Sequence, residues 1–471
     1  MARLVIASNR VPVPKSRGAK AGGLAIALKD TLTPGALWFG WNGRIREHTG
    51  DLPSLVEAHG VTYATIDLSA DDYKRFYVGF ANSCLWPLLH FQPGLLHFRR
   101  EDYQGYLEVN RAFAKALARL LQPDDVVWIH DYHLIPLGRF LREQGVMNRL
   151  GFFLHIPFAP PSLLNSLPVA KELISDFCRY DVVGFQTTEH ARDFLDCAQR
   201  LARGSLVGDY MHAAGGVTQV ITVPIGIDAE GFARDAERAM RTPETARLVE
   251  SLSGRALAIG VDRLDYSKGL LERFEGFGRL FSRYPDHLRK VSFLQVAARS
   301  REDVDQYRNL RLELDRLAGN LNGRFSQFDW APLRYSTRAA RRDVLAGFYR
   351  VARIGLVTPL RDGMNLVAKE FVAAQDENDP GVLILSRFAG AAEELTESLI
   401  VNPFDPDEIA DALHQALVMP LDERIERHDA LRQKVFTSTA SAYCAHFLKM
   451  LRASDRAPAA RFGGLSQMAD A

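Results

Sequence analysis

The 471-residue sequence has few cysteines, no long apolar run and almost no net charge. Its four cysteines stand far apart, without the paired spacing of a zinc site or a redox motif, so we expect reduced, buried thiols and no metal framework. No apolar stretch approaches the roughly 20 residues that span a bilayer. The apolar run after Met1 is too short for a signal peptide and is typical of a first strand. These absences predict a soluble, cytoplasmic protein.

The net charge of the chain is too small to attract a polyanion. Basic residues number 58 and acidic residues 57, so binding to nucleic acid or to a membrane surface is not expected. Basic groups that bind an anion must therefore be placed locally. In addition, no GxGxxG fingerprint follows the first strand of either half of the chain, which disfavours a dinucleotide cofactor of the usual kind.

Short apolar runs alternate with helical patterns along two stretches of the chain, which is typical of α/β domains. Residues 229–252 are charged and helical without an apolar run, and so indicate a domain boundary. We expect one domain over 1–228, with a final helix at about 440–452 packed back on it, and a second over 229–439. Residues 453–471 are rich in Ala, Ser, Gly and Pro and are expected to be disordered.

The stretch 357–375 predicts a strand end, a tight loop and a helix that opens at Leu366. A helix N-terminus beyond the carboxyl end of a strand presents backbone N–H groups to an anion. Asp362 and Glu370 place carboxylates beside that point, where they suit sugar hydroxyls. An ordinary strand–helix connection with a capping carboxylate explains the same residues, and on this stretch alone it is the simpler interpretation.

Other strand ends carry further polar residues. Arg263 and Lys268 lie on one loop before a helix. The planar guanidinium of an arginine and the compact ammonium of a lysine together suit a diphosphate. Asp131 and His155 follow two apolar runs of the first domain, where ligands bind in open α/β sheets. His130 and His133 lack further metal-ligand spacing, so a metal site there is disfavoured.

Two groups near the N-terminus leave functional and structural interpretations equally open. The long loop after the first strand contains Arg10 and the pair Gly22-Gly23, which suit an anion site or an ordinary surface loop. Aromatic residues gather at 36–43 and 77–87, where Trp41, Tyr77 and Trp86 could stack on a sugar or simply fill the core.

An ordered set of motifs across both halves closely resembles the trehalose-6-phosphate synthases, a glycosyltransferase family numbered 20. The resemblance covers about residues 3–450 and rests on SNRVPV, AGGL, LWFGWNG, LWPLLHF, VWIHDYHL, FFLHIPF, GFQT, PIGID, VDRLDYSKG, TPLRDGMNLVAKE and SRFAGAAEEL. It implies a GT-B fold, in which two facing Rossmann-like, doubly wound α/β domains hold the active site in the cleft between them. It also implies retaining transfer of glucose from UDP-glucose to glucose 6-phosphate, giving trehalose 6-phosphate and UDP.

The resemblance carries roles onto matching positions. The implied catalytic group is His155, Asp131, Arg263, Lys268 and Asp362. The implied contacts to UDP-glucose are Gly22, Gly23, Arg263, Lys268, Asp362, Gly363, Met364, Asn365, Leu366, Val367 and Glu370. The implied contacts to glucose 6-phosphate are Arg10, Trp41, Tyr77, Trp86, Asp131 and Arg301. No metal ligand and no cofactor are expected, and the expected assembly is a homodimer or homotetramer.

Three alternatives remain beside this interpretation. A sister enzyme on the same scaffold, such as glucosylglycerol-phosphate synthase or a pseudo-glycosidic coupling enzyme, would differ mainly in its acceptor pocket. A catalytically silent regulatory homologue would have lost catalytic residues, and none of the expected positions is lost. A sugar-nucleotide epimerase would show clustered acid and base carboxylates around the sugar, which these motifs do not contain.

Overall fold

A computed structural model describes residues 2–14, 28, 32–47, 52–301 and 304–454. Gly22 and Gly23 therefore lie outside the described residues, as do residues 455–471 of the expected tail. The chain divides into two compact units, and each is described by itself below. Unit 1 comprises Met1–Pro224 with Ala440–Ala471, and unit 2 comprises Ile225–Thr439. This division falls four residues before the boundary expected from composition.

Unit 1 is built on a ten-stranded sheet with the order β3-β4-β2-β1-β5-β6-β7-β10-β9-β8. The pairs from β4 to β10 along this order are parallel, and the two edges are antiparallel hairpins. The strands are β1 (Leu4–Arg10), β2 (Leu37–Ile45), β3 (Ser54–Ala58), β4 (Val61–Leu68), β5 (Val126–His130), β6 (Arg149–Phe153), β7 (Val182–Phe185), β8 (Ser205–Val207), β9 (Tyr210–Ala213) and β10 (Gly216–Thr222).

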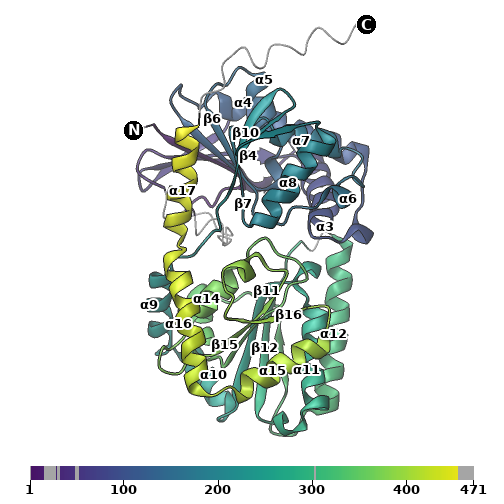
Figure 1. The fold of residues 1–471 in the computed structure, drawn as a ribbon, viewed down its shortest axis with the longest axis vertical. Coiled ribbons are helices and arrows are strands. Elements are labelled where there is room, and N and C mark those ends of the chain that lie inside the picture. Colours follow the sequence, from purple (N-terminus) through teal and green to yellow (C-terminus); the bar gives the residue numbers. More distant parts are fainter. Residues whose placement is uncertain (1, 15–27, 29–31, 48–51, 302–303, 455–471) are drawn as a thin grey trace. The chain divides into compact units, whose positions relative to one another are not determined.

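Helices surround the unit 1 sheet (Figure 1). They are α2 (Ala70–Asp72), η1 (Tyr73–Leu85), α3 (Trp86–Leu89), η2 (Pro93–Leu95), α4 (Arg100–Ala118), η3 (Tyr132–Leu134), α5 (Leu137–Glu143), α6 (Pro161–Leu164), α7 (Ala170–Phe177), α8 (Thr188–Leu201) and α17 (Ala440–Ala453). The last helix packs on β6 and β7 because two glycines leave room for it. A Cβ on Gly151 would meet Leu451 at 2.7 Å, and one on Gly184 would meet Phe447 at 2.9 Å.

The sequence patterns do not predict the structure of two segments of unit 1. Residues 73–85 form a π-helix, a rare form found mostly as single turns near functional sites. Nothing in the spacing of its aromatic residues distinguishes a π-helix from an α-helix. Residues 203–219, which matched no motif, form the β8–β9 hairpin and the start of β10 at one edge of the sheet.

Unit 2 contains a fully parallel six-stranded sheet with the order β13-β12-β11-β14-β15-β16. The strands are β11 (Ala256–Arg263), β12 (Val291–Ala298), β13 (Leu333–Ser336), β14 (Ile354–Val357), β15 (Val382–Ser386) and β16 (Leu399–Val401). The chain first winds outward from β11 to β13 and then continues from β14 to β16 on the other side. This is the doubly wound order of Rossmann-like domains.

The helices of unit 2 form two groups (Figure 1). One group contains α11 (Leu270–Arg283), α12 (Asp305–Phe325) and α15 (Pro406–Val418). The other contains α9 (Ala229–Ala239), α10 (Pro243–Leu252), α13 (Arg342–Val351), α14 (Leu366–Ala374) and α16 (Leu421–Thr437), and the short helices are η4 (Tyr266–Lys268), η5 (Pro285–His287) and η6 (Gly390–Glu393).

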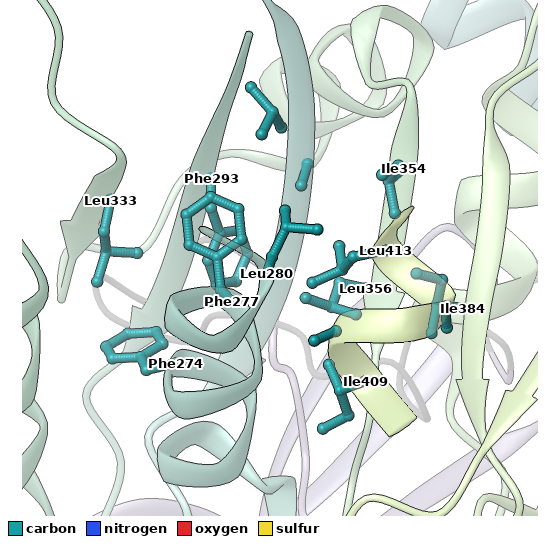
Figure 2. Packing of buried hydrophobic residues seen from close by; sticks show 14 of the residues in the cluster. Phe274, Phe277, Leu280, Phe293, Leu333, Ile354, Leu356, Ile384, Ile409 and Leu413 are labelled. Atoms are coloured by element: carbon teal, nitrogen blue, oxygen red, sulfur yellow. The ribbon is translucent and has the colours of Figure 1, made fainter. Parts of the chain in front are cut away.

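The core of unit 2 lies between its sheet and the pair α11 and α15 (Figure 2). Phe274, Phe277 and Leu280 recur at helical spacing on α11 and pack with Phe293 of β12 and Ile409 of α15. All five side chains are buried. Truncating a phenylalanine such as Phe277 to alanine should cost about 3–5 kcal/mol. This packing holds the carboxyl ends of the strands, and hence the loops that follow them, in place.

Candidate active site

The candidate donor residues of unit 2 lie at or beyond the ends of the two strands at which the winding direction changes. Arg263 ends β11 and Lys268 ends η4, while Asp362 lies in the loop after β14. Ligands of open α/β sheets bind beyond the carboxyl ends of the strands at such a switch point. The fold therefore brings together the two loops that the sequence analysis singled out separately.

A short polar chain links these two loops. Lys268 Nζ lies 2.6 Å from Asp362 Oδ2, and Asn365 Nδ2 donates to the same oxygen at 3.0 Å. The Lys268 and Asp362 side chains are 10% and 16% exposed, so the pair is poorly screened by solvent. Asn365 has a φ of +82°, a left-handed conformation that costs energy in a non-glycine residue. Such strain at a candidate site supports a positioning role for the loop.

Asn365 is also the N-cap of α14. Its side-chain oxygen accepts a hydrogen bond from the Ala368 amide at 3.3 Å, so the amides of Leu366 and Val367 are the first two of the helix. A helix N-terminus with oriented amides favours an anion.

The preceding loop is fixed by its neighbour after β15. The Asp362 amide donates to Phe388 O at 3.1 Å, the Gly390 amide to Asp362 O at 3.1 Å, and the Ala391 amide to Met364 O at 2.8 Å. Gly363, which shares this short loop, is buried. The loop is therefore held by backbone hydrogen bonds that do not depend on a ligand.

Glu370 lies one turn into α14 and meets Arg342 of α13. Arg342 Nε donates to Glu370 Oε1 at 3.2 Å. Burial raises the pKa of Glu370, and the neighbouring guanidinium opposes that rise. The arginine thus presents a carboxylate whose second oxygen is suited to a hydroxyl donor. Arg342 is not among the predicted site residues, because nothing in the linear sequence relates it to Glu370.

Arg301 differs from the other expected acceptor contacts because it belongs to unit 2. Its Nη1 lies 3.1 Å from Asp265 Oδ2 and donates to the Tyr307 hydroxyl at 2.6 Å. The Arg301 side chain is only 6% exposed, and its φ of +50° is left-handed. Two partners therefore fix a guanidinium on a strained backbone just beyond β12.

The sheet of unit 1 also changes winding direction, between β1 and β5. Arg10 ends β1 and Asp131 directly follows β5, so both lie at the carboxyl ends of adjacent strands. Asp131 has a φ of +75°, and its Oδ1 accepts a hydrogen bond from the His155 amide at 3.3 Å. A second strained residue thus occupies a switch point.

Aromatic residues form a continuous chain beside Arg10. The Arg10 guanidinium lies 4.7 Å from the Trp41 ring centre, within cation–π range. Centroid distances along the chain are 6.1 Å for Trp41–Tyr77, 5.6 Å for Tyr77–His133, 3.9 Å for His133–Tyr132 and 5.6 Å for Tyr132–Trp86. Trp41 and Trp86 are 1% and 3% exposed, which fits the core interpretation, whereas Tyr77 is partly exposed.

His155 is held by residues from the two neighbouring strand ends. Its Nε2 lies 3.0 Å from His130 Nδ1, and its Nδ1 lies 3.2 Å from Gln186 Nε2, just after β7. Burial lowers the pKa of His155 to about 3, and burial together with His155 lowers the pKa of His130. Both imidazoles are therefore neutral at physiological pH. Such a group can donate a hydrogen bond but cannot supply a proton as an acid.

The described residues contain no group of three or more His, Cys, Asp or Glu side chains arranged to hold a metal ion. The four cysteines are all buried, without disulfide partners. In the part of the chain that the structure covers, no helix is both long and apolar enough to cross a membrane.

Comparison with known proteins identifies the family. The profile of Glycosyltransferase family 20 matches residues 4–453. The chain belongs to this family. It is therefore a glycosyltransferase, and its two Rossmann-like α/β units are those of the GT-B fold.

Individual members of family 20 are similar over nearly the whole chain. A trehalose-6-phosphate synthase of Sinorhizobium fredii is 46% identical, over 96% of this chain and 99% of the relative. The crystal structure of a UDP-forming α,α-trehalose-phosphate synthase from Burkholderia vietnamiensis has a TM-score of 0.94 at 46% identity, covering 96% and 97% of the two chains. A synthase from Burkholderia xenovorans in complex with glucose-6-phosphate has a TM-score of 0.92 at 44% identity, covering 96% and 100%.

Proposed function

We propose that this protein is an α,α-trehalose-phosphate synthase, which transfers glucose from UDP-glucose to glucose 6-phosphate with retention and releases UDP. The observation that carries the proposal is the switch point of unit 2. There, Lys268, Arg263 and the N-terminus of α14 offer positive charge to a diphosphate beside the Asp362 carboxylate, which suits sugar hydroxyls. The two Burkholderia proteins described above are UDP-forming synthases, and one of them is in complex with glucose-6-phosphate.

The proposed roles follow the charges that develop during the reaction. The bond between glucose C1 and the diphosphate oxygen breaks, so negative charge grows on the leaving group and positive charge on the sugar ring. Lys268, Arg263 and the first amides of α14 stabilise the diphosphate, because fixed dipoles and charges need no reorganisation. Asp362 and the loop 363–365 hold the donor glucose, and Glu370 binds the ribose hydroxyls.

Retention then proceeds on one face of the sugar. The acceptor hydroxyl attacks C1 as the diphosphate departs, and its proton passes to a leaving phosphate oxygen. No side chain needs to act as a general base on this route. Neutral His155 and the Asp131 side chain position the sugars. The proposed acceptor contacts are Arg10, Trp41, Tyr77, Trp86 and Arg301. The proposed donor loop contains Gly22 and Gly23.

UDP release measured with UDP-glucose tests the proposal. Turnover should depend strictly on glucose 6-phosphate and should be absent with glycerol 3-phosphate. Turnover with glycerol 3-phosphate instead would identify a sister enzyme, and no turnover with any acceptor would identify a silent homologue. The same assay with GDP-glucose and ADP-glucose defines the nucleotide preference.

Three further properties belong to this proposal. Turnover should be unchanged by EDTA, because the fixed cations of unit 2 take the place of a metal. The protein should be cytoplasmic, where its phosphorylated substrates would be available. Light scattering should give the mass of a homodimer or homotetramer, since the 52.7 kDa of one chain separates these states clearly.

A further inference from the structure

Arg273 in α11 is a charged residue inside the core of unit 2. Its side chain is fully buried, and it occurs between Leu270 and Phe274 on the apolar face of the helix. A charge at that depth is very costly unless hydrogen-bonded partners compensate it. The reaction described above assigns Arg273 no role, so its partners are the guide to what it does.

The Arg273 guanidinium donates hydrogen bonds to four acceptors, which lie on β11, on β12, directly after β14 and in η4. Nη1 lies 2.5 Å from Asp262 Oδ2 on β11 and 2.9 Å from Gln295 Oε1 on β12. Nε donates to Thr358 Oγ1 at 3.0 Å, directly after β14, and Nη2 donates to Lys268 O at 3.1 Å. The contacts therefore span both loops of the unit 2 switch point.

The position of the guanidinium explains why one residue can reach all four elements. Strands β11 and β14 are paired through Ala258 and Ile259, and β11 then continues to Arg263. The guanidinium lies over Gly260, where an added Cβ would meet Arg273 Nη1 at 2.7 Å. It therefore fills the position beyond the paired residues, immediately behind the loops that carry Arg263 and Lys268.

We propose that Arg273 is a positioning residue for the donor diphosphate. By holding the Lys268 carbonyl, Asp262 and Thr358 in one arrangement, it orients Lys268 and Arg263 toward the leaving group. The inference rests on the proposed function, since it requires that unit 2 bind the sugar nucleotide. A displacement of about 1 Å in such groups can cost two orders of magnitude in rate.

A purely structural role would predict a different response to substitution. Lysine at position 273 keeps a positive charge near Asp262, but its single ammonium cannot bridge four acceptors as the planar fork does. The Arg273→Lys variant should therefore regain much of the melting temperature lost in Arg273→Met. It should not regain affinity for UDP, because Thr358 and the Lys268 carbonyl would still lack the hydrogen bonds that the guanidinium donates.

The experiment measures UDP binding by calorimetry and kinetics with both substrates, well below the melting temperature of each variant. We expect UDP to bind at least tenfold more weakly to Arg273→Lys than to the parent protein. The KM for UDP-glucose should rise, and the KM for glucose 6-phosphate should stay within twofold. UDP affinity within twofold of the parent would overturn the proposal.

Arg424→Met is the matched control, because Arg424 is a buried arginine of unit 2 that pairs with Asp379 away from the donor loops. It should lower the melting temperature and leave UDP affinity unchanged. If Arg273→Met does not fold, Thr358→Val and Gln295→Leu each remove one hydrogen bond of the Arg273 guanidinium, and each should weaken UDP binding two- to fivefold. Parent-like affinity in both would also overturn the proposal. If the parent protein itself does not bind UDP, the proposed function is wrong and this inference fails with it.

Discussion

The candidate residues of the two units differ in how they are held. In unit 2, charged side chains are paired with one another, as in Lys268 with Asp362 and Glu370 with Arg342. In unit 1, aromatic rings and neutral imidazoles predominate, and Arg10 lies over Trp41. Each set is fixed at a switch point of its own sheet, so the difference lies in chemistry and not in topology.

This difference matches the two tasks of a glycosyl transfer. A departing diphosphate requires positive charge in fixed positions, which ion pairs preorganise. A sugar requires apolar faces for its C–H groups and a few directed hydrogen bonds, which aromatic side chains provide. Apart from Arg301, an acceptor contact in unit 2, substitutions at the candidate residues of unit 2 should therefore affect the donor and the chemical step. Substitutions at the acceptor contacts of unit 1 should affect the acceptor.

The largest effect is expected from Lys268→Ala. The change removes the ammonium from the leaving group and also leaves Asp362 without this partner, so kcat/KM should fall about 10³-fold. Circular dichroism should show an intact fold. Lys290→Ala, which removes an exposed lysine of the same unit, should retain parent activity. Near-normal turnover in Lys268→Ala would refute the diphosphate assignment.

Much of unit 2 could be predicted from its sequence because its signals are local. Short apolar runs predict its strands, and the polar residues after them, Arg263, Lys268 and Asp362, are the predicted site residues; the structure brings Lys268 and Asp362 into contact. The resemblance to family 20 is confirmed over residues 4–453. The alternation of short apolar runs with helical patterns predicts the α/β class, whereas the GT-B fold is implied by the resemblance.

What could not be predicted depends on contacts between residues far apart in the sequence. The pairing of Arg342 with Glu370 joins two helices, and the π-helix over residues 73–85 has no distinctive spacing. The hydrogen bonds of Arg273 join Asp262 near the end of β11, Gln295 within β12 and Thr358 directly after β14. The sequence shows only that Arg273 is a charged residue on the apolar face of a helix. That position indicates a buried partner but does not indicate which residue the partner is.

The second largest effect is expected from Arg10→Ala in unit 1. Loss of a charge-assisted contact to the acceptor phosphate should raise the KM for glucose 6-phosphate about 10- to 100-fold. The KM for UDP-glucose should change little. Arg46→Ala is the control, because Arg46 is an exposed arginine near the end of β2 that pairs with Asp67. An equal rise in both KM values would contradict the separation of donor and acceptor sets.

A smaller effect is expected from Glu370→Gln in unit 2. The amide keeps one acceptor for the ribose but loses the charge, so the KM for UDP-glucose should rise about tenfold with kcat nearly unchanged. This pattern would show that Glu370 binds the donor equally well in the ground state and in the transition state. Glu377→Gln, an exposed position that pairs with Arg432, should have no effect. A fall in kcat without a rise in KM would place Glu370 in the chemical step instead.

The last prediction concerns the pH dependence of stability in unit 1, and not turnover. Burial lowers the pKa of His155 to about 3, whereas an unfolded histidine titrates near 6.5. As the pH falls from about 6.5 toward 3, the unfolded chain binds a proton that the folded chain does not. The free energy of unfolding should therefore decrease by up to about 1.4 kcal/mol per pH unit for this group, and its contribution is complete above pH 6.5.

His155→Gln removes this contribution and should give a shallower loss of stability between pH 6.5 and 4. His130 remains buried in the variant, so the difference between the two slopes reports His155 together with its effect on His130. Urea titrations followed by tryptophan fluorescence report on unit 1, because four of the five tryptophans belong to it: Trp38, Trp41, Trp86 and Trp128. Identical slopes would mean that His155 takes up its proton in the folded protein, and the neutral positioning role proposed for it would then be wrong.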